Sequence, residues 1–73
     1  MIIYNPLWET MKKKGVTTYT LREKYKISSN TVRRLKANEN MSTFTLNKLC
    51  EILNCRLDEI AVYIPNKDNT SYK

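Results

Sequence analysis

Apolar residues recur at helical spacing in separate segments of this 73-residue chain, and short polar turns divide the segments. In the clearest segment, residues 43–53, the spacing i, i+3, i+4, i+7 is filled by Leu46, Leu49, Cys50 and Leu53. Residues at this spacing line one side of an α-helix. The pattern predicts an amphipathic helix that Ser42 or Thr43 caps, with Phe44 and Ile52 widening its apolar side.

Another helix is expected near the start of the chain. Asn5 is a suitable cap, and Pro6 suits the first helical position, where its missing N–H costs nothing. The apolar side of this helix consists of Leu7, Trp8 and Met11. Gly15 is expected to end the helix in a left-handed conformation, directly after three lysines that suit the helix dipole.

Two shorter helices are predicted between these segments, separated by a tight turn at Lys26-Ile27. Thr17 can cap the first, of about eight residues, which would face inward through Leu21 and Tyr25. Ser28 can cap the second, at residues 29–37, with Val32 and Leu35 on its inner side. Two short helices joined by a tight turn form a helix-turn-helix arrangement.

The remaining segments complete an all-α domain of five helices over residues 1–65. Residues 57–60 predict a short fifth helix or turn, and residues 66–73 are expected to form a flexible tail. Two β-like runs, at residues 2–4 and 62–64, could pair within one chain or between two. Pairing within one chain is favoured, because the termini of a compact domain usually lie close together.

The positive charge is concentrated in one part of the chain. Residues 12–36, the basic block, hold nine Lys or Arg and one acid, which gives +8. Residues 1–11 and 37–73 each contribute −1, so the total is +6. Such a block favours a polyanion as the partner, because Lys and Arg beside phosphates release condensed counterions. The alternative is a solvated basic face without a partner.

The residues that catalytic and metal sites commonly need are scarce. The chain has no His, and its two cysteines, Cys50 and Cys55, cannot close a tetrahedral zinc site alone. We expect both to be reduced thiols, with Cys50 in the core, although a disulfide between them is conceivable. No catalytic motif, cofactor motif, signal peptide or apolar run of about 20 residues is present. These observations favour a cytoplasmic, non-enzymatic protein without a cofactor.

The outer side of the predicted helix 29–37 is polar and cationic, which suits contact with DNA. Asn can pair with adenine and Arg with guanine in the major groove, so the expected base contacts are Ser29, Asn30, Arg33 and Arg34. Hydroxyl, amide and ammonium groups near helix ends suit phosphates, so the expected phosphate contacts are Thr17, Thr18, Lys36, Asn40 and Thr43. Ordinary solvated surface is the alternative reading of each residue.

The run TTYTLREKYKISSNTVRRLKANEN, followed by TLNKLCEILNCRLDEI, resembles the Cro/C1-type (XRE-like) helix-turn-helix proteins of bacteria and phages. The resemblance covers residues 5–60 and implies a lambda-repressor-like fold in a small regulator of transcription. Three positions depart from the family pattern. Arg22 stands where a small residue is usual, Lys26 where Gly is usual, and Thr18 where Gln is frequent. Arg22 must therefore extend outward past the third helix, and Lys26 must tolerate a strained turn.

The leading hypothesis is sequence-specific binding of double-stranded DNA by a homodimer. One recognition helix covers few base pairs, so two copies are expected on a palindromic site. The surface around Leu57, Ile60 and Val62 is the favoured interface, and the β-like runs are the alternative. A rival hypothesis is a protein-interaction module of antitoxin or antirepressor type. Non-specific RNA binding is disfavoured, because the aromatic residues fall at core positions.

Overall fold

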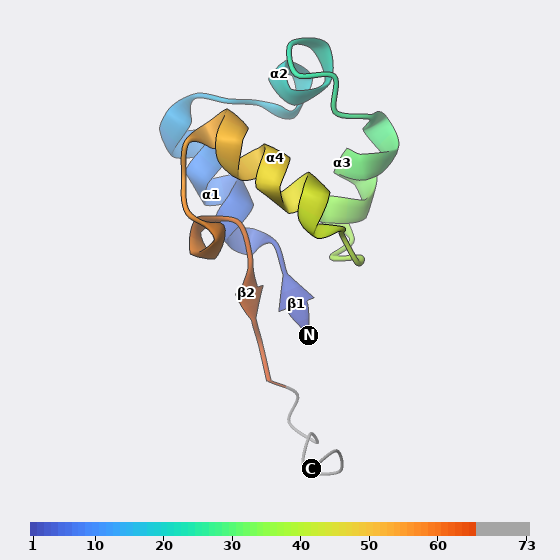
Figure 1. Cartoon of the computed structure of the whole chain (residues 1–73), viewed down its shortest axis with the longest axis vertical. Helices are drawn as coiled ribbons and strands as arrows, with labels where there is room; N and C mark the ends of the chain where they lie inside the picture. Colours follow the sequence, from blue (N-terminus) through green and yellow to red (C-terminus); the bar gives the residue numbers. More distant parts are fainter. Residues whose placement is uncertain (66–73) are drawn as a thin grey trace.

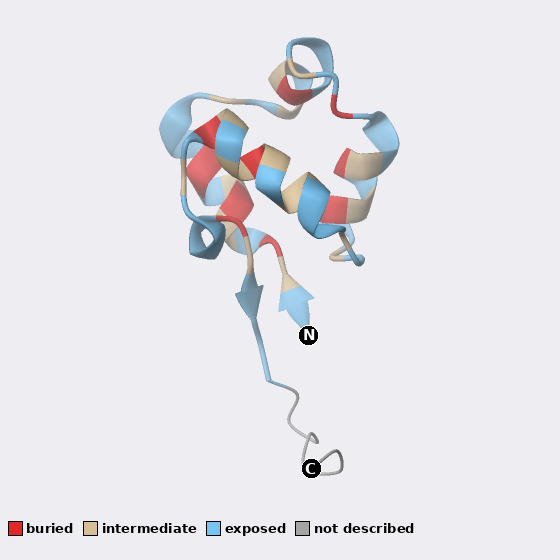
Figure 2. Ribbon diagram, in the orientation of Figure 1, coloured by how far each residue is buried: buried red, intermediate tan, exposed pale blue. Residues whose placement is uncertain are grey.

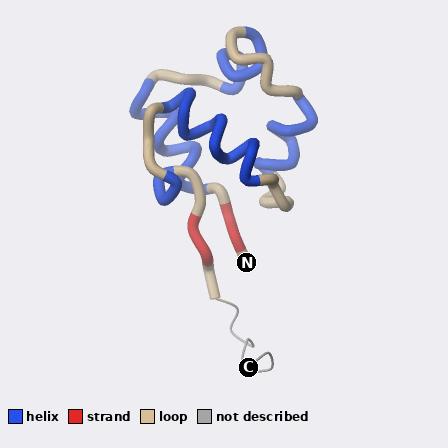
Figure 3. The backbone as a smooth tube through the Cα atoms, in the orientation of Figure 1, coloured by secondary structure: helices blue, strands red, loops and turns tan. Residues whose placement is uncertain are grey.

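The structure is a computed structural model that describes residues 1–65, and the predicted tail at 66–73 lies outside them. Four α-helices form the body of the domain: α1 (Asn5–Lys14), α2 (Thr18–Glu23), α3 (Ser29–Lys36) and α4 (Thr43–Leu53). A 3₁₀ turn, η1 (Leu57–Glu59), takes the place of the predicted fifth helix. Strands β1 (Ile2–Ile3) and β2 (Val62–Tyr63) extend together from the helical body (Figures 1 and 3). The predicted all-helical class with a short terminal strand pair is confirmed.

Three helices begin at the predicted hydroxyl caps. The side chains of Thr17, Ser28 and Ser42 each accept a hydrogen bond from the backbone N–H three residues further on. These bonds satisfy N–H groups that a helix start leaves without a partner. The predicted Asn5 cap is wrong, because Tyr4 occupies the cap position and Asn5 already belongs to α1.

Three helices end in the same motif. A left-handed residue follows each helix: Gly15 (φ 69°), Asn38 (φ 57°) or Asn54 (φ 50°). The next N–H then bonds the carbonyl five residues back, in Val16→Met11 (2.9 Å), Glu39→Arg34 (2.9 Å) and Cys55→Cys50 (3.1 Å). This is the Schellman motif, in which the side chains at these two positions commonly touch. The motif therefore brings together two apolar residues at the end of α1, two charged residues at the end of α3 and two cysteines at the end of α4.

Helix α2 is shorter than predicted, with six residues rather than about eight. Lys26 adopts the left-handed conformation (φ 60°), which confirms the strained turn expected there. The N–H of Ile27 then bonds the carbonyl of Leu21 at 3.0 Å, and both side chains are buried. The turn therefore ends α2 early and directs the chain into α3.

The hydrophobic core is formed by side chains from all four α-helices (Figure 2). Its fully buried side chains are Leu7, Leu21, Leu35, Leu49, Leu53 and Ile60. Because Ile60 belongs to this core, the prediction that it lines a dimer interface is wrong. Cys50 is only half-buried, packed against the core rather than within it.

The prediction that Phe44 widens the apolar side of α4 is also wrong. Its side chain is 75% exposed, whereas that of Leu49 is completely buried. The two are five positions apart in the sequence, which places them about 140° apart around a helix. Phe44 therefore projects from the opposite side of the first turn of α4.

The two terminal segments pair within one chain, as favoured from the sequence. Strands β1 and β2 are antiparallel, with Ile2 opposite Tyr63 and Ile3 opposite Val62. The amino group of Met1 extends the ladder by donating to the carbonyl of Ile64 at 2.7 Å. Thr10 donates to the carbonyl of Glu59 at 2.8 Å and so connects α1 to the turn before β2.

Candidate nucleic-acid interface

The orientation of α3 follows from its buried side. Val32 and Leu35 anchor the helix in the core, and Ile27 anchors the turn before it. Four predicted DNA contacts lie at exposed positions of the helix: Ser29, Asn30, Arg33 and Lys36. The helix thus has an apolar inner side and a polar outer side that contains no acidic residue.

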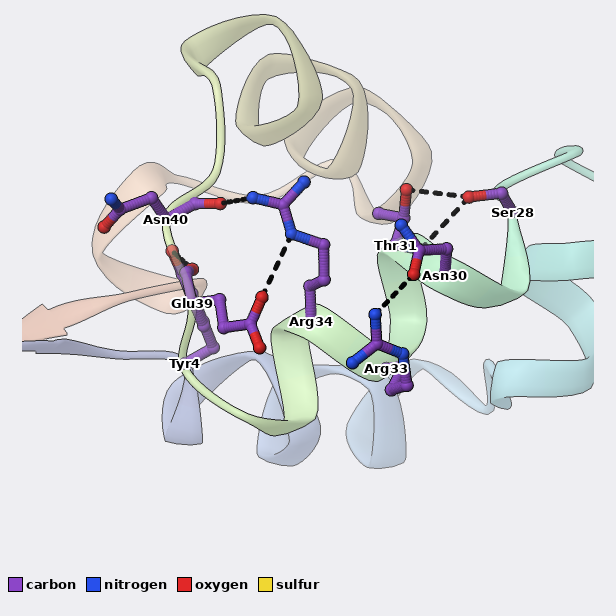
Figure 4. Close-up of polar contacts among 8 residues, drawn as sticks. All are labelled: Tyr4, Ser28, Asn30, Thr31, Arg33, Arg34, Glu39 and Asn40. Carbon is purple, nitrogen blue, oxygen red and sulfur yellow. Dashed lines mark hydrogen bonds and ion pairs between the residues drawn. The ribbon is translucent and has the colours of Figure 1, made fainter.

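Asn30 and Arg33 form a pair on this outer side. The Arg33 guanidinium donates a hydrogen bond of 2.6 Å to Oδ1 of Asn30, one helical turn earlier (Figure 4). Both residues are exposed. The bond uses one of the five guanidinium N–H groups and leaves the donors of the Asn30 amide available. The pair can therefore present several donors together to one edge of a ligand.

Arg34 lies on a different side of α3 and is half-buried. Its Nε is 3.3 Å from Oε1 of Glu39, and a terminal nitrogen donates to the carbonyl of Asn40 at 2.8 Å (Figure 4). The Schellman motif at the end of α3 explains this contact, because it places residues 34 and 39 together. Two predicted site residues, Arg34 and Asn40, are thus joined in one arrangement at the edge of α3.

Tyr4 anchors the loop that holds Arg34. Its backbone N–H donates to Oδ1 of Asn38 at 2.9 Å, and its hydroxyl donates to the carbonyl of Glu39 at 2.8 Å. Burial raises the pKa of Tyr4 and the nearby Arg34 charge lowers it, with burial dominant. The hydroxyl therefore remains a proton donor at neutral pH.

Tyr4 and Glu39 were not among the residues predicted for this site. Glu39 could have been found by treating Asn38 as the left-handed residue after α3, which makes residues 34 and 39 a contact pair. Tyr4 gives no comparable signal, because its partners lie 34 and 35 residues away in the chain. Only the tertiary structure brings them together.

A shallow hollow of about 290 Å³ lies between α2 and α3. Its lining consists of Thr18, Arg22, Ser29, Val32, Arg33 and Lys36. Three of these residues are cationic and none is acidic, so the hollow suits an anionic group. Four predicted site residues therefore come together here: Thr18, Ser29, Arg33 and Lys36. Arg22 joins them and is exposed beside α3, as expected from the sequence.

The remaining predicted phosphate contacts lie at helix starts on either side of α3 in the chain. Thr17 caps α2 and shares a 3.0 Å hydrogen bond with the hydroxyl of Thr20, while Thr18 is half-buried. Thr43 is exposed at the first position of α4, and Asn40 is exposed in the loop before it. Of these residues, Thr18 lines the hollow between α2 and α3, whereas Thr17, Asn40 and Thr43 lie outside it.

Little neutralises the basic block within residues 1–65. One ion pair involves it, that of Arg34 with Glu39. The other ion pair of the described residues joins Arg56 to Asp58, outside the block. The same residues hold no group of three or more His, Cys, Asp or Glu side chains placed to bind a metal ion. Nor does any helix among them have the length and apolar character to cross a membrane.

Comparison with known proteins agrees with this geometry. A sequence model of the Cro/C1-type HTH DNA-binding domain matches residues 6–66. The crystal structure of the transcriptional regulator VanUg (form II) has a similar fold, with a TM-score of 0.80 and 34% sequence identity. That match covers 89% of this chain and 87% of the other. No match was found among curated proteins.

Proposed function

Because the chain belongs to the Cro/C1-type helix-turn-helix DNA-binding family, we propose that it regulates transcription by reading a specific sequence of double-stranded DNA. The proposal places α3 in the major groove, which is wide enough to admit one α-helix. The exposed Asn30–Arg33 pair supports it most directly, since both residues can bond base edges. No catalysis or cofactor is involved, and the cytoplasm is the proposed location.

The base contacts proposed are Ser29, Asn30, Arg33 and Arg34. Asn30 is suited to adenine and Arg33 to guanine, and the bond between them aligns the two side chains before DNA arrives. Arg34 would contact DNA with the donors that Glu39 and Asn40 leave available. Holding its guanidinium in one orientation reduces the entropy lost on binding.

The phosphate contacts proposed are Thr17, Thr18, Lys36, Asn40 and Thr43. Lys36 would supply charge from the α2–α3 hollow, together with Arg22. The hydroxyl and amide groups would fix the position of the domain along the groove, because phosphate contacts set register and base contacts set sequence.

We further propose that the protein binds DNA as a homodimer. A group of exposed apolar residues, here called the apolar end, surrounds the strand pair and η1: Met1, Ile2, Leu57, Val62, Tyr63 and Ile64. It borders a hollow of about 530 Å³ whose lining also includes Asn38, Asn40 and Met41 from the loop after α3. A two-fold axis through this end would therefore lie near the C-terminal ends of both recognition helices. Two helices about 34 Å apart would require a palindromic site.

Selection from a random duplex library, followed by anisotropy titrations with the selected and a scrambled duplex, tests the proposal. We expect one sequence to be enriched and bound about 10³-fold or more tightly than the scrambled duplex. Affinity should fall linearly on a log–log plot against salt, with a slope that reflects several phosphate contacts. Equal affinity for both duplexes would refute specific reading. Absence of DNA binding, with capture of a protein through the apolar end, would favour the interaction module of antitoxin or antirepressor type.

A further inference from the structure

The two cysteines occupy the contact positions of the Schellman motif that ends α4. Asn54 is left-handed (φ 50°, ψ 55°), and its N–H bonds the carbonyl of Glu51 at 3.3 Å. The N–H of Cys55 bonds the carbonyl of Cys50 at 3.1 Å. Together these two bonds define the motif, and it sets the backbone of Cys55 beside that of Cys50.

The equivalent positions at the end of α3 show what this geometry does to side chains. Arg34 and Glu39 have the same backbone bond, and their charged groups meet at 3.3 Å. At the end of α4 the same positions hold two thiols, which are free and only half-buried. Burial raises the pKa of the Cys55 thiol, and the neighbouring Cys50 thiol raises it further. Cys50 and Cys55 are therefore neighbours through side chain as well as backbone.

We propose that Cys50 and Cys55 form a reversible dithiol–disulfide site whose oxidant is a low-molecular-weight disulfide of the glutathione type. One cysteine thiolate attacks the small disulfide, forms a mixed disulfide and releases one small thiolate. The second cysteine thiolate then attacks the first cysteine sulfur and releases the other small thiolate. Overall, the protein loses two protons and two electrons, and the small disulfide becomes two small thiols.

The site lies apart from the proposed DNA-reading surface. The C-terminal end of α4 is beside α1, whereas its N-terminal end is near α3 (Figure 1). The disulfide would connect the last turn of α4 to the loop that precedes η1. None of the proposed base or phosphate contacts lies in this segment, so the disulfide can form without altering those contacts.

Incubation of the native protein with glutathione redox buffers, followed by acid quenching and intact mass measurement, tests the proposal. We expect a species that has lost two hydrogen atoms, carries no glutathione, and forms in the same proportion at every protein concentration. The matched controls are Cys50→Ser and Cys55→Ser, each of which should stop at the mixed disulfide. Glutathione on both cysteines of the native protein, or a concentration-dependent disulfide between two chains, would overturn the proposal.

A second pair of variants tests the role of the backbone motif. Asn54→Gly keeps access to the left-handed conformation, whereas Asn54→Val strongly disfavours it. Circular dichroism would first show that both variants remain helical. We expect Asn54→Gly to close the disulfide at least as readily as the native protein and Asn54→Val to close it less readily. Equal equilibrium constants for the two variants would show that the motif does not bring the thiols together.

Discussion

The hydroxyl of Tyr4 donates a 2.8 Å hydrogen bond to the main-chain carbonyl of Glu39, 35 residues away. Glu39 in turn pairs with Arg34 on α3. The residue at the cap position of α1 thus fixes the loop that follows α3. The orientation of Arg34 therefore depends on a contact made by the N-terminal segment of the chain.

Tyr4→Phe should remove this bond while retaining the buried ring. The Glu39 carbonyl would lose a partner, so we expect stability to fall by about 1 kcal/mol. Urea unfolding measures this change, and the backbone bond from Tyr4 to Asn38 should persist.

In the native protein, the raised pKa of Tyr4 means that its stabilising contribution is present at neutral pH. It should be lost as pH rises past the range in which tyrosine ionises. Tyr4→Phe should lack this alkaline loss, and an identical pH profile would contradict the assignment.

Substitution of the Asn30–Arg33 pair should weaken specific binding more than random binding. We expect Asn30→Ala and Arg33→Ala each to cost about 1–3 kcal/mol on the selected duplex. Because the two side chains are bonded to each other, their effects should not add in the double variant. Anisotropy titrations of the four proteins complete the cycle. Equal losses of Asn30→Ala on selected and scrambled duplexes would remove Asn30 from base reading.

Lys36→Ala should weaken binding to the selected and scrambled duplexes alike. Loss of one phosphate contact should reduce the magnitude of the log–log salt slope by about 1. Arg56→Ala is the matched control, because it removes the same charge from a side chain that is 84% exposed beside η1. If Arg56→Ala reduces the slope as much as Lys36→Ala does, net charge alone explains the effect.

Leu49→Ala should destabilise the fold by about 2–5 kcal/mol, because it leaves a cavity at the centre of the core. Leu49 is fully buried, whereas Phe44 on the same helix is 75% exposed. Phe44→Ala should therefore change stability by about 0.5 kcal/mol or less. Thermal and urea unfolding of the two variants give a direct comparison. Similar losses in both would mean that Phe44 contributes to the core.

The starts of α2, α3 and α4 were predictable from the sequence because their signals are local, whereas the start of α1 was misplaced by one residue. Thr17, Ser28 and Ser42 each cap a helix through a bond that reaches only three residues forward. The predicted tight turn at Lys26-Ile27 is likewise present. Phe44 was assigned to the wrong side because a run of apolar residues does not by itself fix which of them face the core. That choice depends on how α4 packs against the rest of the domain.

The candidate site was predictable in part for the same reason. The outer side of α3 follows from helical geometry once Val32 and Leu35 are placed inside. The partners of Arg34 could be predicted only by identifying Asn38 as the left-handed residue after α3, and the role of Tyr4 required the tertiary structure. Ile60 was assigned to an interface because its apolar character suits a monomer core and a dimer contact equally. Burial in the structure decides for the core.

The proposed dimer can be tested at Leu57. Leu57 is 56% exposed at the apolar end, so Leu57→Glu should leave the fold intact and place a charge in the proposed interface. A buried unpaired charge is costly, so we expect the variant to dissociate and to lose affinity for the palindromic duplex.

Glu51→Gln serves as a control, because Glu51 is exposed on α4 and does not belong to the apolar end. Sedimentation of each protein with the selected duplex gives the number of chains bound. For the native protein we expect two chains per duplex, with cooperative binding, and for Leu57→Glu one chain on a half-site. One native chain per duplex at saturation, on a site without a repeated half, would show that the protein acts as a monomer. A Leu57→Glu variant that still binds as a pair would place the interface elsewhere on the surface.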